Sequence, residues 1–127
     1  MSDATYDVDA LPGREKPVVW LHGRVESPPF SHRARVMIGE LLKRVQRGDK
    51  LPLPHCRPMP TIGRRCHELR VRDEDREWRL FYFAGEKAIV VLDVVLKKTP
   101  CTPRRVVEGC RRRLGIYMVS EQGGDTP

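Results

Sequence analysis

The sequence predicts an α+β domain in which a small antiparallel sheet carries both helices on one of its faces, in the order β-α-β-β-β-α. Three observations predict it. The 127 residues suffice for one domain. Hydrophobic residues make up 39% of the chain and charged residues 32%, which favours a thin core with a single sheet. Strand-like and helix-like patterns also alternate along the chain in that order.

The first half contains one strand and one helix. Residues 1–15 are acidic and are expected to form a flexible extension. Residues 17–22 are apolar and β-favouring, and Gly23 ends this strand. Apolar residues recur at helical spacing over 31–47, where Ser27 and Ser31 are both possible N-caps and Gly48 is a stop.

The second half contains three strands and the second helix. Four prolines between residues 51 and 63 predict a segment without regular structure. Strands are expected at 66–72, 77–83 and 87–96, joined by tight turns into an antiparallel meander. Thr102 and Pro103 then open a helix. The folded domain is expected to span 16–117, with a flexible tail at 118–127.

The net charge of +7 favours a polyanionic partner such as nucleic acid. No apolar run approaches the ~18 residues of a membrane span, and the N-terminus lacks the features of a secretory signal. We therefore expect a cytoplasmic protein without a membrane partner. The four cysteines are expected to be reduced, and their spacing fits no usual zinc site, so neither a metal nor a cofactor is expected.

The polar face of the predicted meander is the candidate site. Alternation places Glu68, Arg70 and Arg72 on one face of their strand, and Arg79 stands within an aromatic run of the next strand. Lys97 and Lys98 follow the third strand. Several cations on one face would bind an anion. Alternatively, Arg79 pairs with Glu68 or Asp93 and only braces the sheet.

These residues resemble a known family. The chain resembles the phage-derived branch of the RelE/HigB toxin superfamily in the order of its motifs. These motifs are His67-Glu68-Leu69-Arg70, an acidic turn, Trp78-Arg79-Leu80-Phe81-Tyr82, and Lys97-Lys98-Thr99 before Thr102-Pro103. The resemblance covers residues 17–114. It implies a type II toxin–antitoxin toxin with a RelE-like fold, which cleaves mRNA on the ribosome without a metal. It also implies a helix-turn-helix antitoxin as partner, in a possible hetero-oligomer.

The resemblance and the basic residues around it together give candidate roles to single residues. The candidate catalytic residues are Arg70, Arg79, Lys97, Lys98 and Glu68, and the candidate substrate-binding residues are Arg72, Tyr82, Arg64 and Arg65. The chain departs from the branch in two places: no aromatic residue precedes the lysine pair, and the loop 51–63 is unusually rich in proline. That loop is interpreted either as a gate over the RNA groove or as scaffolding.

Metal-free RNA cleavage requires cations to stabilise the charged phosphate, a base for the 2′-hydroxyl and an acid for the leaving oxygen. Glu68, Asp93, His67 or a lysine with a lowered pKa are candidates for the base, although alternation places His67 on the face opposite Arg70. Two other hypotheses are a non-catalytic RNA- or DNA-binding module and a phage-derived protein-interaction module of the same fold.

Overall fold

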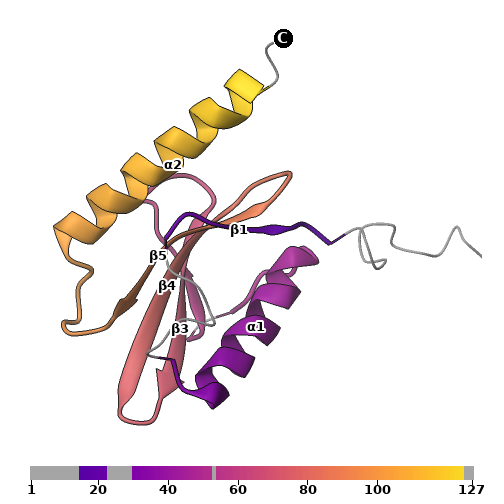
Figure 1. Ribbon diagram of the computed structural model, residues 1–127. Coiled ribbons are helices and arrows are strands. Elements are labelled where there is room, and N and C mark those ends of the chain that lie inside the picture. Colours follow the sequence, from indigo (N-terminus) through magenta and orange to yellow (C-terminus); the bar gives the residue numbers. More distant parts are fainter. Residues whose placement is uncertain (1–14, 23–29, 53, 125–127) are drawn as a thin grey trace, which may run out of the picture.

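The computed structural model describes residues 15–22, 30–52 and 54–124, which form a five-stranded sheet and two helices (Figure 1). Of the predicted extension at 1–15, residues 1–14 lie outside the described residues. The elements in chain order are β1 Val18–Trp20, α1 His32–Gln46, β2 Cys56–Pro58, β3 Cys66–Asp73, β4 Arg76–Ala84, β5 Ile89–Leu96 and α2 Arg104–Gly124.

The strands lie side by side in the order β1-β5-β4-β3-β2. The predicted meander of β3, β4 and β5 is confirmed, with antiparallel pairs such as Arg70 opposite Arg79 and Leu80 opposite Val94. The expectation of an entirely antiparallel sheet is wrong, because β1 pairs with β5 in parallel. The chain leaves β1 through α1 and re-enters the sheet at the opposite edge, so β1 completes the sheet beside the last strand.

The proline-rich segment 51–63 contributes a strand that the sequence did not predict. Cys56–Pro58 forms β2, which pairs antiparallel with β3 and places Arg57 opposite Glu68. A proline is tolerated there because β2 is the edge strand and needs no outward hydrogen-bond donor. The segment is therefore part of the sheet, which favours scaffolding over a gate.

Helix α1 covers one face of the sheet, here called the α1 face. Its N-cap is Ser31, whose hydroxyl accepts a hydrogen bond from the Ala34 amide at 3.1 Å. The spacing of Ala34, Ile38, Leu42 and Val45 puts all four on the buried side of the helix. They pack in one core cluster with strand residues Leu69, Val71, Trp78, Leu80, Tyr82, Ile89 and Val91.

Helix α2 packs on the opposite face, here called the α2 face (Figure 1), so the prediction of both helices on one face is wrong. Val106 and Cys110 of α2 join a second core cluster with Phe81, Phe83, Val90 and Leu92. The physical reason is that β4 and β5 carry apolar side chains on both of their faces, and each face must be covered.

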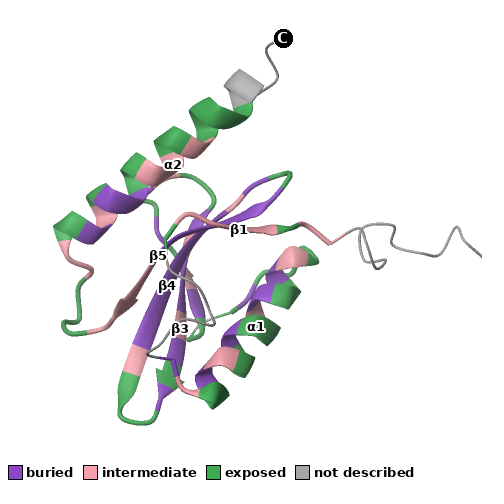
Figure 2. Ribbon diagram, in the orientation of Figure 1, coloured by how far each residue is buried: buried purple, intermediate pink, exposed green. Residues whose placement is uncertain are grey.

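Helix α2 is also longer than expected. It runs to Gly124, so residues 118–124 are helical and not the predicted flexible tail. Its last turns extend beyond the sheet and expose Ile116, Met118 and Val119 (Figure 2). In the described part of the chain, neither helix is both long and apolar enough to cross a membrane.

Candidate nucleic-acid interface

A buried carboxylate on the α2 face holds three arginines. Glu68 is completely buried. Its Oε1 accepts hydrogen bonds from Nε of Arg57 at 2.8 Å and from Nε of Arg70 at 3.0 Å. Nε of Arg79 lies 3.1 Å from Oε2, an ion-pair contact without hydrogen-bond geometry. These four residues are called the Glu68 cluster below.

Strand register assembles the Glu68 cluster. Arg57 on β2 stands directly opposite Glu68 on β3, and Arg70 stands opposite Arg79 on β4. Side chains two residues apart on one strand share a face, so Glu68 and Arg70 point the same way. Three neighbouring strands therefore each deliver a charged side chain to the same patch of the α2 face.

Arg79 is almost completely buried, with only 1% of its surface exposed. Its Nη2 donates to the carbonyl oxygens of Thr99 at 3.1 Å and Pro100 at 2.9 Å. The loop between β5 and α2 thus lies over this guanidinium. The buried charge is compensated by a carboxylate and two carbonyls, which is the condition for stably burying an arginine. The bracing interpretation of Arg79 with Glu68 matches this geometry, whereas Asp93 lies elsewhere.

Arg57 and Arg70 remain accessible, with side chains 36% and 28% exposed. Three guanidinium groups share the single carboxylate of Glu68, so the patch keeps an excess of positive charge. A second carboxylate stands at its border: Oε2 of Glu77 lies 3.8 Å from Nε of Arg70. The Glu77 side chain is 21% exposed, and its Oε2 is buried without a hydrogen-bond partner among the described residues. The patch therefore places an accessible guanidinium beside a partly buried carboxylate, a pair of groups that can bind a phosphate and accept a proton.

The lysine pair lies at the same end of the sheet. The Lys97 amide donates to the Glu77 carbonyl at 2.8 Å, which continues the pairing of β5 with β4 and puts Lys97 beside Glu77. A cavity of about 490 Å³ lies between the end of β5 and the start of α2. Arg79, Lys98 and Arg105 are the charged residues that line it.

Four candidate substrate-binding residues are not brought into the Glu68 cluster. Tyr82 is buried on the α1 face, where its hydroxyl contacts Sγ of Cys56 at 3.3 Å. Arg64 and Arg65 precede β3, and Arg65 lies about 23 Å along the strand from Arg72. Arg72 is exposed at the far end of β3, opposite Glu77 and beyond Arg70, so it borders the cluster without contacting Glu68.

The geometry separates the candidate bases. Both oxygens of Glu68 are engaged with arginines, and the residue has no exposed surface. Asp93 lies 3.5 Å from His22 and 3.5 Å from Arg113, which itself donates to the Leu92 carbonyl and so ties α2 to β5. His67 lies on the α1 face, stacked on Tyr82.

Two functional candidates were missed by the reading of the sequence. Arg57 belongs to a proline-rich segment, and only the register of β2 reveals that it faces Glu68. Glu77 begins the predicted strand that contains Arg79, and alternation along that strand puts the two on the same face. That alternation was the available signal for Glu77, whereas no local signal existed for Arg57.

The cysteines form no metal centre in the described ranges, where no group of three potential ligands is placed to hold an ion. Cys56 belongs to the α1-face core and Cys66 to the α2-face core, so the two lie on opposite sides of the sheet. Burial raises the pKa of the Cys66 thiol to about 11 and that of Cys110 to about 12. Both behave as small core residues.

Comparison with known proteins gives one match. Residues 29–115 match the family model described as "Phage derived protein Gp49-like (DUF891)", which covers more than half of the chain. The match includes α1, the meander of β3 to β5 and the first half of α2, and thus the whole Glu68 cluster. No curated protein and no solved structure matches the chain.

Proposed function

Because the chain belongs to the phage-derived Gp49-like protein family, we propose that it is the toxin of a type II toxin–antitoxin system. The family is associated with such systems. In this proposal the protein is a metal-free endoribonuclease that cleaves mRNA on the ribosome and so inhibits translation. The supporting observation is the accessible fork of Arg70 beside the carboxylate of Glu77, on a surface with excess positive charge.

The reaction is a transesterification in which the nucleophile is a 2′-hydroxyl group of the RNA itself. The 2′-oxygen attacks the adjacent phosphorus, the bond from phosphorus to the 5′-oxygen breaks, and a 2′,3′-cyclic phosphate and a 5′-hydroxyl result. Negative charge develops on the non-bridging oxygens, where fixed guanidinium and ammonium groups stabilise it. A base removes the 2′-proton and an acid returns one to the leaving oxygen.

The geometry suggests a role for each residue. Arg70 and Arg57 bind the phosphate, since both keep accessible guanidinium groups. Glu77 accepts the 2′-proton, and Lys97 beside it protonates the leaving oxygen. Glu68 and Arg79 are positioning residues: they are buried, and they hold the Arg57 and Arg70 side chains in place without reaching RNA.

The remaining elements of the proposal concern partners. The ribosome presents the mRNA, and exposed arginines such as Arg72, Arg104 and Arg105 are suited to contacts with ribosomal RNA. A helix-turn-helix antitoxin neutralises the toxin in the cytoplasm, and a neighbouring reading frame for such a protein would support this part.

Expression in bacteria tests the proposal. The wild-type chain is expected to arrest growth, with new 5′ ends mapped in translated mRNA. Arg70→Ala combined with Lys97→Ala is expected to abolish both effects. Arg33→Ala combined with Lys43→Ala is the matched control, since both residues are exposed on α1 and far from the cluster. Arrest and cleavage that persist in the first double variant would overturn the site assignment.

A second candidate function is a non-catalytic RNA-binding module. It is favoured by the engagement of Glu68 and Arg79 with each other, because a braced arginine patch binds phosphates without any proton transfer. Both functions predict binding that weakens steeply with salt. The second function would be favoured if the protein binds stably to translating ribosomes and the mRNA on them stays intact, with no new 5′ ends.

A further inference from the structure

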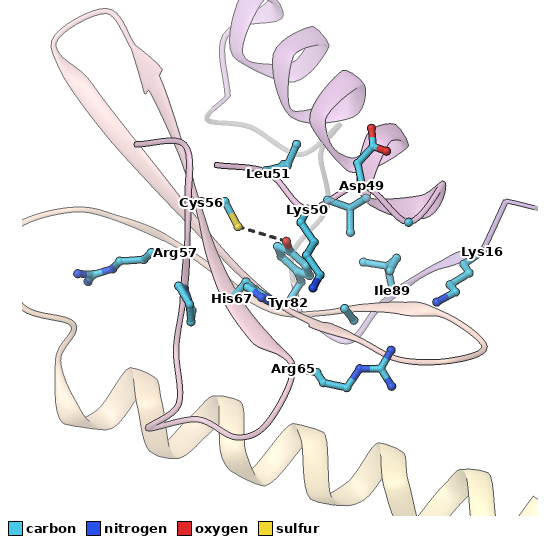
Figure 3. A pocket seen from close by; sticks show the side chains of 14 residues that line it. Lys16, Asp49, Lys50, Leu51, Cys56, Arg57, Arg65, His67, Tyr82 and Ile89 are labelled. Carbon is cyan, nitrogen blue, oxygen red and sulfur yellow. Dashed lines mark hydrogen bonds between the residues drawn. The ribbon is translucent and has the colours of Figure 1, made fainter. Parts of the chain in front are cut away.

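A second cavity, drawn in Figure 3, lies on the α1 face. Its lining includes Arg65 and His67 at the start of β3, and so it lies at the end of that strand opposite to Arg72. Its volume is about 580 Å³, within the range of small-molecule sites. Its walls come from the segment before β1, the turn after α1, β2, the start of β3 and the end of β4. It shares no residue with the proposed RNA site except Arg57 at its border.

Besides Arg57 at the border, three basic side chains from separate segments line this cavity. Lys16 precedes β1, Lys50 follows α1 and Arg65 precedes β3. Lys16 donates one hydrogen bond to the Gly85 carbonyl at 2.9 Å, which fixes its ammonium and leaves its other protons for a ligand. Asp49 is the one carboxylate among the lining residues; Figure 3 shows it pointing away from the cavity, and its Oδ2 lies 3.4 Å from Arg44. The cavity is therefore strongly cationic.

The floor of the cavity is aromatic and apolar. His67 stacks on Tyr82 with ring centroids 5.3 Å apart and planes inclined by 22°. Burial lowers the pKa of His67, so the ring lies in the floor as a largely neutral imidazole, with a smaller opposing effect from the Arg65 backbone. Val45, Leu51 and Ile89 complete the apolar part. A cationic border over an apolar and aromatic floor fits an anion with a flat organic body.

The backbone at Arg65 adds an independent observation. Arg65 has φ of 62°, in the left-handed region that favours glycine. An arginine in this conformation is disfavoured by about 1 kcal/mol relative to glycine. Its guanidinium nevertheless lies at the cavity (Figure 3), so the position keeps a long cationic side chain where the backbone would favour glycine.

We propose that this cavity binds a nucleoside monophosphate. Lys16, Lys50 and Arg65 contact the phosphate, and the base lies over the floor formed by His67 and the apolar residues. The site is separate from the proposed RNA-cleaving surface, and its occupancy does not depend on cleavage.

Titration calorimetry with AMP, inorganic phosphate and adenosine tests the proposal on the full chain. AMP is expected to bind, while phosphate and adenosine each bind at least ten-fold more weakly, because each supplies half of the contacts. Equal affinity for AMP and phosphate would overturn the role of the floor. No heat and no chemical-shift change with AMP would overturn the site.

Two variants locate the binding. Lys50→Ala and Arg65→Gly are each expected to weaken AMP binding at least five-fold, and Arg65→Gly does so without lowering the melting temperature, because it relieves the backbone. The matched controls are Lys43→Ala, an exposed lysine on α1, and Glu74→Gly, at the other described non-glycine residue of positive φ. Unchanged affinity in both cavity variants, or an equal loss in the controls, would overturn the assignment. The readout is binding, so failure here leaves the RNA-cleavage test unaffected.

Discussion

Nε of Arg79 lies 3.1 Å from Oε2 of Glu68, and the two side chains are 1% and 0% exposed. A buried pair of this kind is weak evidence for net stability, but the loss of one partner leaves an uncompensated charge inside the protein. The pair also fixes Glu68, which in turn holds Arg57 and Arg70. The positions of the accessible side chains of Arg57 and Arg70 thus depend on the buried ion pair between Arg79 and Glu68.

Glu68→Gln is expected to lower the free energy of unfolding by about 3–5 kcal/mol, because Arg79 then lacks a charged partner. Urea denaturation measures this. Glu77→Gln is the control: Glu77 is partly exposed and its contact with Arg70 is long, so a loss below about 1 kcal/mol is expected. Similar losses in both variants would contradict the hub role of Glu68.

Glu77→Gln is expected to reduce mRNA cleavage about 10²–10⁴-fold, the usual range for loss of a general base. Affinity for the ribosome should stay within about two-fold, because the amide keeps the shape and the arginines remain. Mapped 5′ ends and ribosome co-sedimentation give the two readouts. Full cleavage by this variant would remove Glu77 from the mechanism.

Asp73→Ala is expected to cost about 2 kcal/mol of stability. Oδ2 of Asp73 accepts hydrogen bonds from the Ser31 amide and from Nε1 of Trp78, both at 3.1 Å, and so ties the start of α1 to the β3–β4 hairpin. Asp75→Ala, an exposed change in the same hairpin, is the control and should cost little. Thermal unfolding of both variants measures the two losses, and equal losses would contradict the role of Asp73 in tying α1 to the hairpin.

The same carboxylate gives a pH dependence. Hydrogen bonding from Ser31, with smaller contributions from Trp78 and Arg76, lowers the pKa of Asp73 below its ordinary value of 3.8. The unfolded chain therefore binds a proton at higher pH than the folded protein. The stabilisation by Asp73 is fully present above the ordinary pKa and declines as the pH falls through the lowered one. Unfolding curves from pH 5 to pH 2 should converge for the wild type and Asp73→Ala.

Gly85→Ala is expected to destabilise the protein by about 1–3 kcal/mol. A Cβ at this position would lie 2.9 Å from the Ala88 carbonyl oxygen and 2.9 Å from the Phe83 ring. The Gly85 amide donates to that carbonyl at 2.9 Å, so the turn cannot open freely. Gly39→Ala, where nothing lies within 4 Å, is the control and should be neutral or stabilising in its helix. Equal melting temperatures would contradict this packing.

Alkylation should distinguish the cysteines. The raised pKa values of Cys66 and Cys110, about 11 and 12, keep these thiols protonated at pH 8, and both are buried. Burial likewise raises the pKa of Cys56. Cys101 is exposed. Iodoacetamide followed by mass spectrometry should show one modified cysteine in the native protein and four after denaturation. Rapid native labelling of Cys110 would contradict the packing of α2.

Local patterns predicted the elements well where each has its own signal. Ser31 and the apolar spacing after it located α1 to within a residue at each end. Alternation from His67 to Arg72 assigned the two faces of β3, because successive strand residues point to opposite sides. The pairing of Arg79 with Glu68 was one of the interpretations considered, since both stand on that face.

Other features depend on contacts between distant segments. β2 is a strand only because β3 offers its edge, and Arg57 joins Glu68 through that pairing. Tyr82 is an exception, because alternation along β4 alone puts it with His67 on the α1 face and away from Arg70. Arg65 and Lys50 share a cavity although fifteen positions separate them.

The sequence by itself determined an α+β domain, a basic surface and the face to which Glu68, Arg70 and Arg79 point, because these follow from composition and from the period of two along a strand. Only the tertiary structure decided that α2 covers the face opposite α1, that the loop at Thr99 and Pro100 buries Arg79, and that Glu77 stands beside Arg70. The reason is that the burial of a side chain and its ion-pair partners depend on how distant segments pack, and a local sequence pattern does not specify which segment will cover a given face.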